Sequence, residues 1–367
     1  MRVFTDSRSV YIRVIRAIRV LSQGTVPLHN GTQEYKVFSK NGNGNTMFLT
    51  LKEPVDNLCD YTFNFAWQSN KQRPDSAIPS QDGTVYTYKD LVNELKAGKE
   101  VRIKGNAGKR LGYSMGVDLA HFGGTGAPEN AGKLFIVGSV SSEMGMGMVS
   151  GTIYIKGSIE EPIGNVVEVV SDESGYRKFR SITDIMCKGI GKDMLIKNSY
   201  DEKEKHLVLD DKVFRGTIAA RCDCEALVTI DGDVYNGTGL LMKKGTVHVK
   251  GNAGMNTGAH LDGGVMIVEG EAGEFAGAYM KKGVLVLKDA KGFVGAGMKD
   301  GVIFAKKKIK TAPPVEELAM AQDDARLIMK YLGLGHVEAM GYHKYGIMRE
   351  RLVRMRDGSV VVRKIEE

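Results

Sequence analysis

The sequence has few of the residues that build disulfide-rich or membrane-spanning proteins. Its 367 residues include 4 cysteines, 8 prolines and 1 tryptophan. No apolar run approaches the roughly 18 residues that a spanning helix needs. Four cysteines (Cys59, Cys187, Cys222 and Cys224) are too few to hold a fold together by disulfides, and we predict reduced thiols in a cytoplasmic protein. These shortages exclude a disulfide-rich secreted domain and a transmembrane protein.

Charge and the N-terminal residues argue against a nucleic-acid partner and a secretory signal. Lys and Arg total 51 and Asp and Glu 44, a modest excess spread along the chain. The densest basic run, residues 306–310, is predicted to be a solvated end of the core rather than a nucleic-acid patch. Arg13, Arg16 and Arg19 interrupt the apolar stretch over residues 10–21, which excludes a signal peptide and leaves an organelle presequence as an alternative.

Glycine is the abundant residue, and its spacing is regular. The chain has 46 glycines, and Gly232, Gly251 and Gly270 stand at positions i, i+19 and i+38. Further glycines follow at i+7 and i+13 from each start, and a β-branched quartet such as Val265–Val268 follows the third glycine. The same frame fits upstream, with insertions near residues 117–131 and 171–207. The sequence therefore contains eight coils, which start at residues 105, 138, 157, 213, 232, 251, 270 and 289.

This period predicts a parallel β-solenoid over residues 105–305. Each coil must turn several times and return one strand spacing, about 4.8 Å, further along. Glycine at fixed columns fits positive φ and close approach of neighbouring turns. Stacking then buries the apolar faces that one coil leaves exposed. The predicted turn glycines are Gly105, Gly112, Gly138, Gly145, Gly151, Gly157, Gly164, Gly232, Gly239, Gly245, Gly251, Gly258, Gly264, Gly270, Gly277, Gly283, Gly295 and Gly301.

A second column of large flexible side chains stands at the ninth or tenth position after the start of most coils. We interpret it as an internal ladder that fills the solenoid core, because it repeats as the glycines do. A thioether metal site or docking stripe is the alternative interpretation. The column consists of Met115, Met148, Met242, Leu261, Met280 and Met298.

The flanking segments carry different patterns. Residues 1–84 combine strand signals with turn-rich polar stretches and are predicted to form an α+β extension. Thr87 and Asp90 resemble a capping box that opens a helix ending at Gly98. The predicted domains are residues 1–84, the β-helix over 85–310, and a tail over 311–367.

The tail is predicted to hold a helix and a hairpin. The apolar spacing from Val315 to Leu332 indicates one helix. The dipeptide Asp357-Gly358 is typical of a hairpin turn, and strand-like residues flank it.

The coils resemble a known family. The segment Lys250–Gly264, with the sequence KGNAGMNTGAHLDGG, is similar to the GXGXG β-helix. That domain forms the C-terminal part of the large subunit of glutamate synthase and also occurs as a separate subunit. It is also found in one subunit of formylmethanofuran dehydrogenase and in N-methylglutamate synthases. The resemblance covers roughly residues 85–305, and His343–Gly346 is closer to the glutamate synthase type. It implies a mainly β fold, a right-handed parallel β-helix.

The resemblance implies a non-catalytic scaffold in a glutamate-synthase-like complex, because the β-helix of glutamate synthase packs between the glutaminase and flavin domains and supplies no catalytic residue that matches this sequence. The expected partners are glutaminase-type and flavin synthase-type subunits, with FMN and iron–sulfur clusters in those partners and no cofactor in this chain. No nucleic-acid or membrane partner is expected. The β-helix component of a formylmethanofuran dehydrogenase, a molybdenum or tungsten complex, is one alternative, and a stand-alone interaction scaffold is another. Residues 1–84 and the 171–207 insertion lack counterparts and are predicted to serve partner docking.

Independent chemistry has two weak candidates and no predicted catalytic residue. Cys222 and Cys224 have a spacing that allows two thiolates to share a metal, although a closed site needs about four ligands. We favour two small residues at a coil turn. His121, Gly123 and Gly124 lie in a glycine-rich insert that is predicted to be a loop facing a partner. The insert lacks the Lys-Ser/Thr of a phosphate-binding P-loop.

Overall fold

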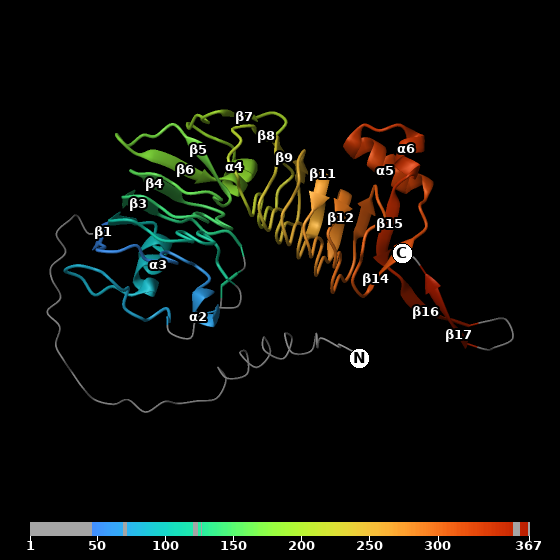
Figure 1. Cartoon of the computed structure of the whole chain (residues 1–367), viewed down its shortest axis with the longest axis horizontal. Helices are drawn as coiled ribbons and strands as arrows, with labels where there is room; N and C mark the ends of the chain where they lie inside the picture. Colours follow the sequence, from blue (N-terminus) through green and yellow to red (C-terminus); the bar gives the residue numbers. More distant parts are fainter. Residues whose placement is uncertain (1–45, 69–71, 120–123, 126, 355–359, 366–367) are drawn as a thin grey trace, which may run out of the picture. The chain divides into compact units, whose positions relative to one another are not determined.

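The computed structural model describes residues 46–68, 72–119, 124–125, 127–354 and 360–365. In this part of the chain, coils stack so that strands from successive coils lie side by side (Figure 1). The prediction of a mainly β solenoid is confirmed, and its handedness stays a prediction. No described helix is long and apolar enough to cross a membrane.

The first sheet contains four parallel strands and an antiparallel addition. β3 pairs with β4 so that Lys133 lies opposite Thr152, one full period further along the chain. The insertion after the third predicted coil supplies β6, which pairs antiparallel with β4 on one side and with β5, just before the insertion, on the other. In spatial order the strands are β1 (Thr46–Thr50), β2 (Glu100–Lys104), β3 (Lys133–Val137), β4 (Thr152–Ile155), β6 (Arg177–Ser181) and β5 (Val166–Val169).

Strand β1 differs from the sequence prediction, which assigned its residues to an extension before the solenoid. β1 pairs in parallel with β2, and Val55 forms a parallel bridge with Ala107 on the next face. The carbonyl of Leu58 then accepts a hydrogen bond of 2.9 Å from the Gly112 amide. Residues 46–58 therefore add a coil. Glycine periodicity did not show it because residues 46–82 contain no glycine.

The second sheet contains the most regular coils. Leu227, Thr246, Val265 and Val284 lie opposite one another, each one full period after the last, and Val302 follows one position earlier than that period would place it. This register confirms the predicted period and the shorter last coil. The parallel strands are β8 (His206–Leu209), β9 (Leu227–Ile230), β10 (Thr246–Val249), β11 (Asp262–Ala272), β12 (Lys282–Ala290) and β13 (Val302–Ala305), with β7 (Asn198–Asp201) antiparallel at the edge.

Two glycines illustrate why the coils need this residue. Gly258 has φ +63°, a left-handed conformation that costs an L-residue about 1–2 kcal/mol. Gly251 has no positive φ, but a Cβ there would lie 2.6 Å from the carbonyl carbon of Gly232 in the coil before. The first glycine supplies a turn, and the second allows neighbouring coils to approach.

The methionine column lies inside the solenoid. Its six side chains are at most 2% exposed. Met242, Met280 and Met298 belong to one continuous apolar core with Val247 and Leu285. The internal ladder is therefore confirmed for this column.

Helices and antiparallel strands lie at the two ends. α3 (Tyr88–Lys96) has the predicted Thr87–Asp90 capping box. The C-terminal prediction was partly wrong, because β14 (Val315–Leu318) precedes α5 (Gln322–Leu332) and pairs antiparallel with β15. The tertiary pairing of β14 therefore overrides the helical spacing of its residues. The other elements are α2 (Phe65–Gln68), α4 (Ile182–Lys188), α6 (His336–Met340) and β15 (His343–Ile347).

The predicted terminal hairpin is present. β16 (Arg349–Arg354) pairs antiparallel with β17 (Val360–Ile365). The predicted turn at Asp357 and Gly358 lies outside the described residues, as does the N-terminal stretch with Arg13, Arg16 and Arg19.

Candidate functional site

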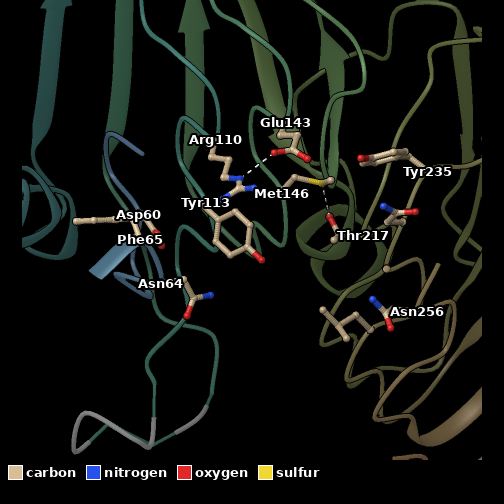
Figure 2. Close-up of a pocket in the computed structure, with 13 residues that line it drawn as sticks. Asp60, Asn64, Phe65, Arg110, Tyr113, Glu143, Met146, Thr217, Tyr235 and Asn256 are labelled. Carbon is tan, nitrogen blue, oxygen red and sulfur yellow. Dashed lines mark hydrogen bonds and ion pairs between the residues drawn. The ribbon is translucent and has the colours of Figure 1, made fainter. Parts of the chain in front are cut away.

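A cavity of about 350 Å³ opens on one edge of the solenoid. This edge, the turn edge, is formed by the turns that contain Arg110, Glu143, Thr217 and Asn256. Its walls come from residues 60–65, which follow the added first coil, and from later coils of the solenoid (Figure 2). The lining is mixed polar and apolar, and several side chains have hydrogen-bonding groups. The lining residues are Asp60, Asn64, Phe65, Arg110, Tyr113, Glu143, Met146, Thr217, Tyr235, Asn236, Gly237, Leu240 and Asn256.

Four polar residues of the lining occupy the same turn position in their coils, the fourth or fifth residue after the coil start. Residues other than glycine rarely adopt positive φ, and such residues gather at functional sites. The sequence analysis missed this signal because it followed only the glycine columns. At this turn position φ lies between 52° and 69° in six coils. The residues are Arg110, Glu143, Thr217, Asn256, Phe275 and Phe293.

An ion pair lies at the mouth of the cavity. The Nε of Arg110 donates a hydrogen bond of 2.8 Å to Oε2 of Glu143 in the next coil, and this bond raises the pKa of Arg110. In Figure 2 the two side chains point toward each other above Tyr113. Burial raises the pKa of Tyr113, so its hydroxyl keeps its proton. The two side chains carry opposite charges that offset each other.

Asp60 is a further ionisable group in the cavity lining and is only 3% exposed. Burial raises its pKa, although it accepts hydrogen bonds from Thr62 through the amide at 2.8 Å and the hydroxyl at 2.6 Å. The two bonds from Thr62 therefore hold Asp60 in place. The lining offers donors and acceptors but no histidine, serine or cysteine that would form a nucleophile–base pair.

The structure brings three cysteines together. Cys187 in α4 forms a disulfide with Cys224. The Sγ of Cys222 lies 3.4 Å from that of Cys224 and 3.9 Å from that of Cys187. The prediction of reduced thiols is wrong for Cys187 and Cys224, whereas Cys59 and Cys222 are free and buried. The sequence did not predict this cluster, because Cys187 lies in the insertion, far from Cys222 and Cys224 along the chain.

The loop predicted to face a partner is only partly described. His121 and Gly123 lie outside the described residues. Near Gly124, the carboxylate of Asp118 accepts hydrogen bonds from the Thr125 amide at 2.7 Å and hydroxyl at 3.0 Å. These bonds lower the pKa of Asp118. The role of the loop stays a prediction.

Comparison with known proteins identifies one close relative. An uncharacterized protein of Methanothermobacter thermautotrophicus is 46% identical over 279 residues, which are 76% of this chain and 89% of the relative. The chain belongs to the family of this protein. No family model matches the chain, so membership of the GXGXG family stays a prediction.

One solved structure has a distant likeness. A chain in the crystal structure of the formyltransferase/hydrolase complex FhcABCD from Methylorubrum extorquens, with methylofuran bound, covers 80% of this chain and 91% of its own length. The identity is 18% and the TM-score 0.24. At that score the likeness carries no functional argument.

Proposed function

We propose that this protein is a non-catalytic scaffold subunit of a multi-subunit enzyme complex, with a glutamate-synthase-like complex as the first candidate. The glycine repeat and its resemblance to the GXGXG β-helix support a scaffold. The single observation that carries the proposal is an aromatic surface on the turn edge.

The aromatic surface consists of His260, Phe275, Tyr279 and Phe293, which lie on three consecutive coils. His260 stacks on Tyr279 with ring centroids 5.0 Å apart, and Phe275 stacks on Phe293 at 5.1 Å. Tyr279 is 45% exposed and Phe293 is 53% exposed. Burial lowers the pKa of His260, so its ring is neutral at pH 7.

Clustered exposed aromatic side chains indicate a protein interface, because their burial against a partner releases water from apolar surface. The same turn position lines the cavity with Arg110, Thr217 and Asn256 and then carries Phe275 and Phe293 in the last coils. We infer that partner subunits bind along this edge. Glutaminase-type and flavin synthase-type subunits are the proposed partners, and FMN and iron–sulfur clusters are proposed to reside in them.

The test is affinity purification of the tagged full chain from the organism that encodes it, with mass identification of stoichiometric partners. Recovery with glutaminase and flavin synthase subunits would support the proposal. Recovery with a molybdopterin or tungstopterin enzyme would instead support the formylmethanofuran dehydrogenase alternative. Recovery alone would favour the stand-alone scaffold.

A variant comparison tests the surface itself. Tyr279→Ser with Phe293→Ser should lose the partners, since both side chains contribute exposed apolar area. Val337→Ser in α6 is the matched control, because Val337 is 87% exposed but lies away from this turn edge. Equal recovery of partners with both proteins would contradict the assignment of the surface.

A further inference from the structure

The three-cysteine cluster is a second site, built from two segments far apart in sequence. Cys187 lies near the end of α4 in the insertion, and Cys222 and Cys224 lie in the turn before β9. All three sulfur atoms lie within 4.8 Å of one another. Cys222 is fully buried, whereas Cys187 and Cys224 are partly exposed, so the cluster opens toward the surface.

Buried hydrogen bonds hold the two segments in register. The hydroxyl of Thr183 in α4 donates to the carbonyl of Ala220 at 2.9 Å. Asn165 donates to the Thr183 hydroxyl at 2.7 Å and accepts from the Ala219 amide at 2.9 Å. Each of these residues is at most 3% exposed. The sulfur atoms are therefore positioned by rigid backbone, as a preformed ligand site requires.

Their arrangement argues against a thiol–disulfide relay. A thiolate that breaks a disulfide attacks along the line of that bond, so it lies much farther from one sulfur than from the other. The Sγ of Cys222 is instead 3.4 Å from Cys224 and 3.9 Å from Cys187, beside the bond. The three sulfur atoms form a triangle.

Two sides of that triangle match the sides of one face of a metal tetrahedron, and the third side is the Cys187–Cys224 disulfide bond, which must open on reduction. Zinc–sulfur bonds of about 2.3 Å in a tetrahedral site separate the sulfur atoms by about 3.8 Å. The two distances from Cys222, 3.4 Å and 3.9 Å, lie on either side of this value. We propose that, in the reduced protein, Cys187, Cys222 and Cys224 bind one Zn²⁺, with the fourth position open to water at the surface.

Binding first requires reduction of the disulfide. A dithiol reductant transfers two electrons and two protons to Cys187 and Cys224 and becomes a disulfide itself. The Zn²⁺ then replaces the protons of three thiols and leaves a site with a net charge of −1. Thiolates are the ligands that soft and borderline cations prefer.

The surroundings also favour a cation over a free thiolate. The carboxylates of Asp223 and Glu225 place negative charge near Cys222. Asp223 is partly neutralised by Lys243 and Lys244, at 3.4 Å and 3.7 Å.

The test titrates the reduced full chain with Co²⁺, a spectroscopic substitute for Zn²⁺, without oxygen and in a phosphine reductant. The proposal expects one equivalent to bind, with an intense sulfur-to-cobalt charge-transfer band that one equivalent of Zn²⁺ removes. The oxidised chain should show no such band, because two of its three ligands are in the disulfide.

Two variants make the test specific. Cys222→Ser leaves the Cys187–Cys224 disulfide available and should lose the charge-transfer band. Cys59→Ser also removes a buried free thiol but at a distant position, and should bind as the parent does. Binding without a sulfur band, no binding by the reduced parent, or unchanged binding by Cys222→Ser would each overturn the proposal. Circular dichroism of Cys222→Ser confirms its fold, so a lost band reports the ligand.

Discussion

The buried ion pair between Asp211 and Arg215 allows a sharp prediction of stability. The Arg215 side chain is 3% exposed and that of Asp211 is 7% exposed. Two guanidinium nitrogens donate to the two carboxylate oxygens at 2.6 Å and 2.5 Å. The Nε of Arg215 also donates to the Val166 carbonyl at 2.9 Å, which connects β5, just before the insertion, to the coil that follows the insertion.

Asp211→Asn should reduce the free energy of unfolding by about 3–5 kcal/mol, because it leaves the Arg215 charge buried without a countercharge. Adding Arg215→Met should recover part of the loss, since the uncompensated charge is then removed. Urea denaturation followed by circular dichroism measures both effects, and an unchanged slope with urea would show that the change is in stability.

The matched control is Asp231→Asn, which breaks the exposed pair with Lys212. Water screens exposed ion pairs, so this variant should unfold at nearly the parent's urea concentration. A loss below about 1 kcal/mol for Asp211→Asn, or equal losses for both variants, would refute the reasoning.

The same pair predicts a dependence on pH. Burial alone would raise the pKa of Asp211, but the two donors of Arg215 outweigh it and lower that pKa. A lowered folded-state pKa contributes stability above the unfolded pKa of about 3.9, and this contribution disappears as pH falls through the folded value. Asp211→Asn should therefore lose less stability than the parent between neutral pH and this acidic range.

Three further changes have predictable effects. Gly258→Val should lower the melting temperature by calorimetry, since left-handed backbone costs about 1–2 kcal/mol before β-branching adds to it; an unchanged value would mean that the repeat register is wrong. Thr217→Val should cost about 1–3 kcal/mol in urea, because the Gly147 amide loses its acceptor at 2.8 Å, and an unchanged midpoint would contradict this. Reduction of the disulfide between Cys187 and Cys224, which are 37 residues apart, should cost about 4 kcal/mol without metal, and identical curves with and without reductant would disprove the constraint.

The repeating part of the fold could be predicted from the amino-acid sequence. A glycine with φ +63° at Gly258 and a close approach at Gly251 are local backbone requirements, so they leave a periodic trace in the sequence. The buried methionine column and the quartets that became β10 and β13 follow the same period. Neighbouring coils make the same contacts, and one set of residue preferences therefore recurs in every coil.

The first coil, the cavity and the cysteine cluster emerged only from the three-dimensional arrangement. β1 pairs with β2 although the long segment between Thr50 and Glu100 separates them, and that coil has no glycine that marks its turns. Cys187 reaches Cys222 because α4 packs on a later coil through Thr183. Contacts between segments with different local patterns leave no periodic trace, since they depend on where the insertion folds back onto the solenoid.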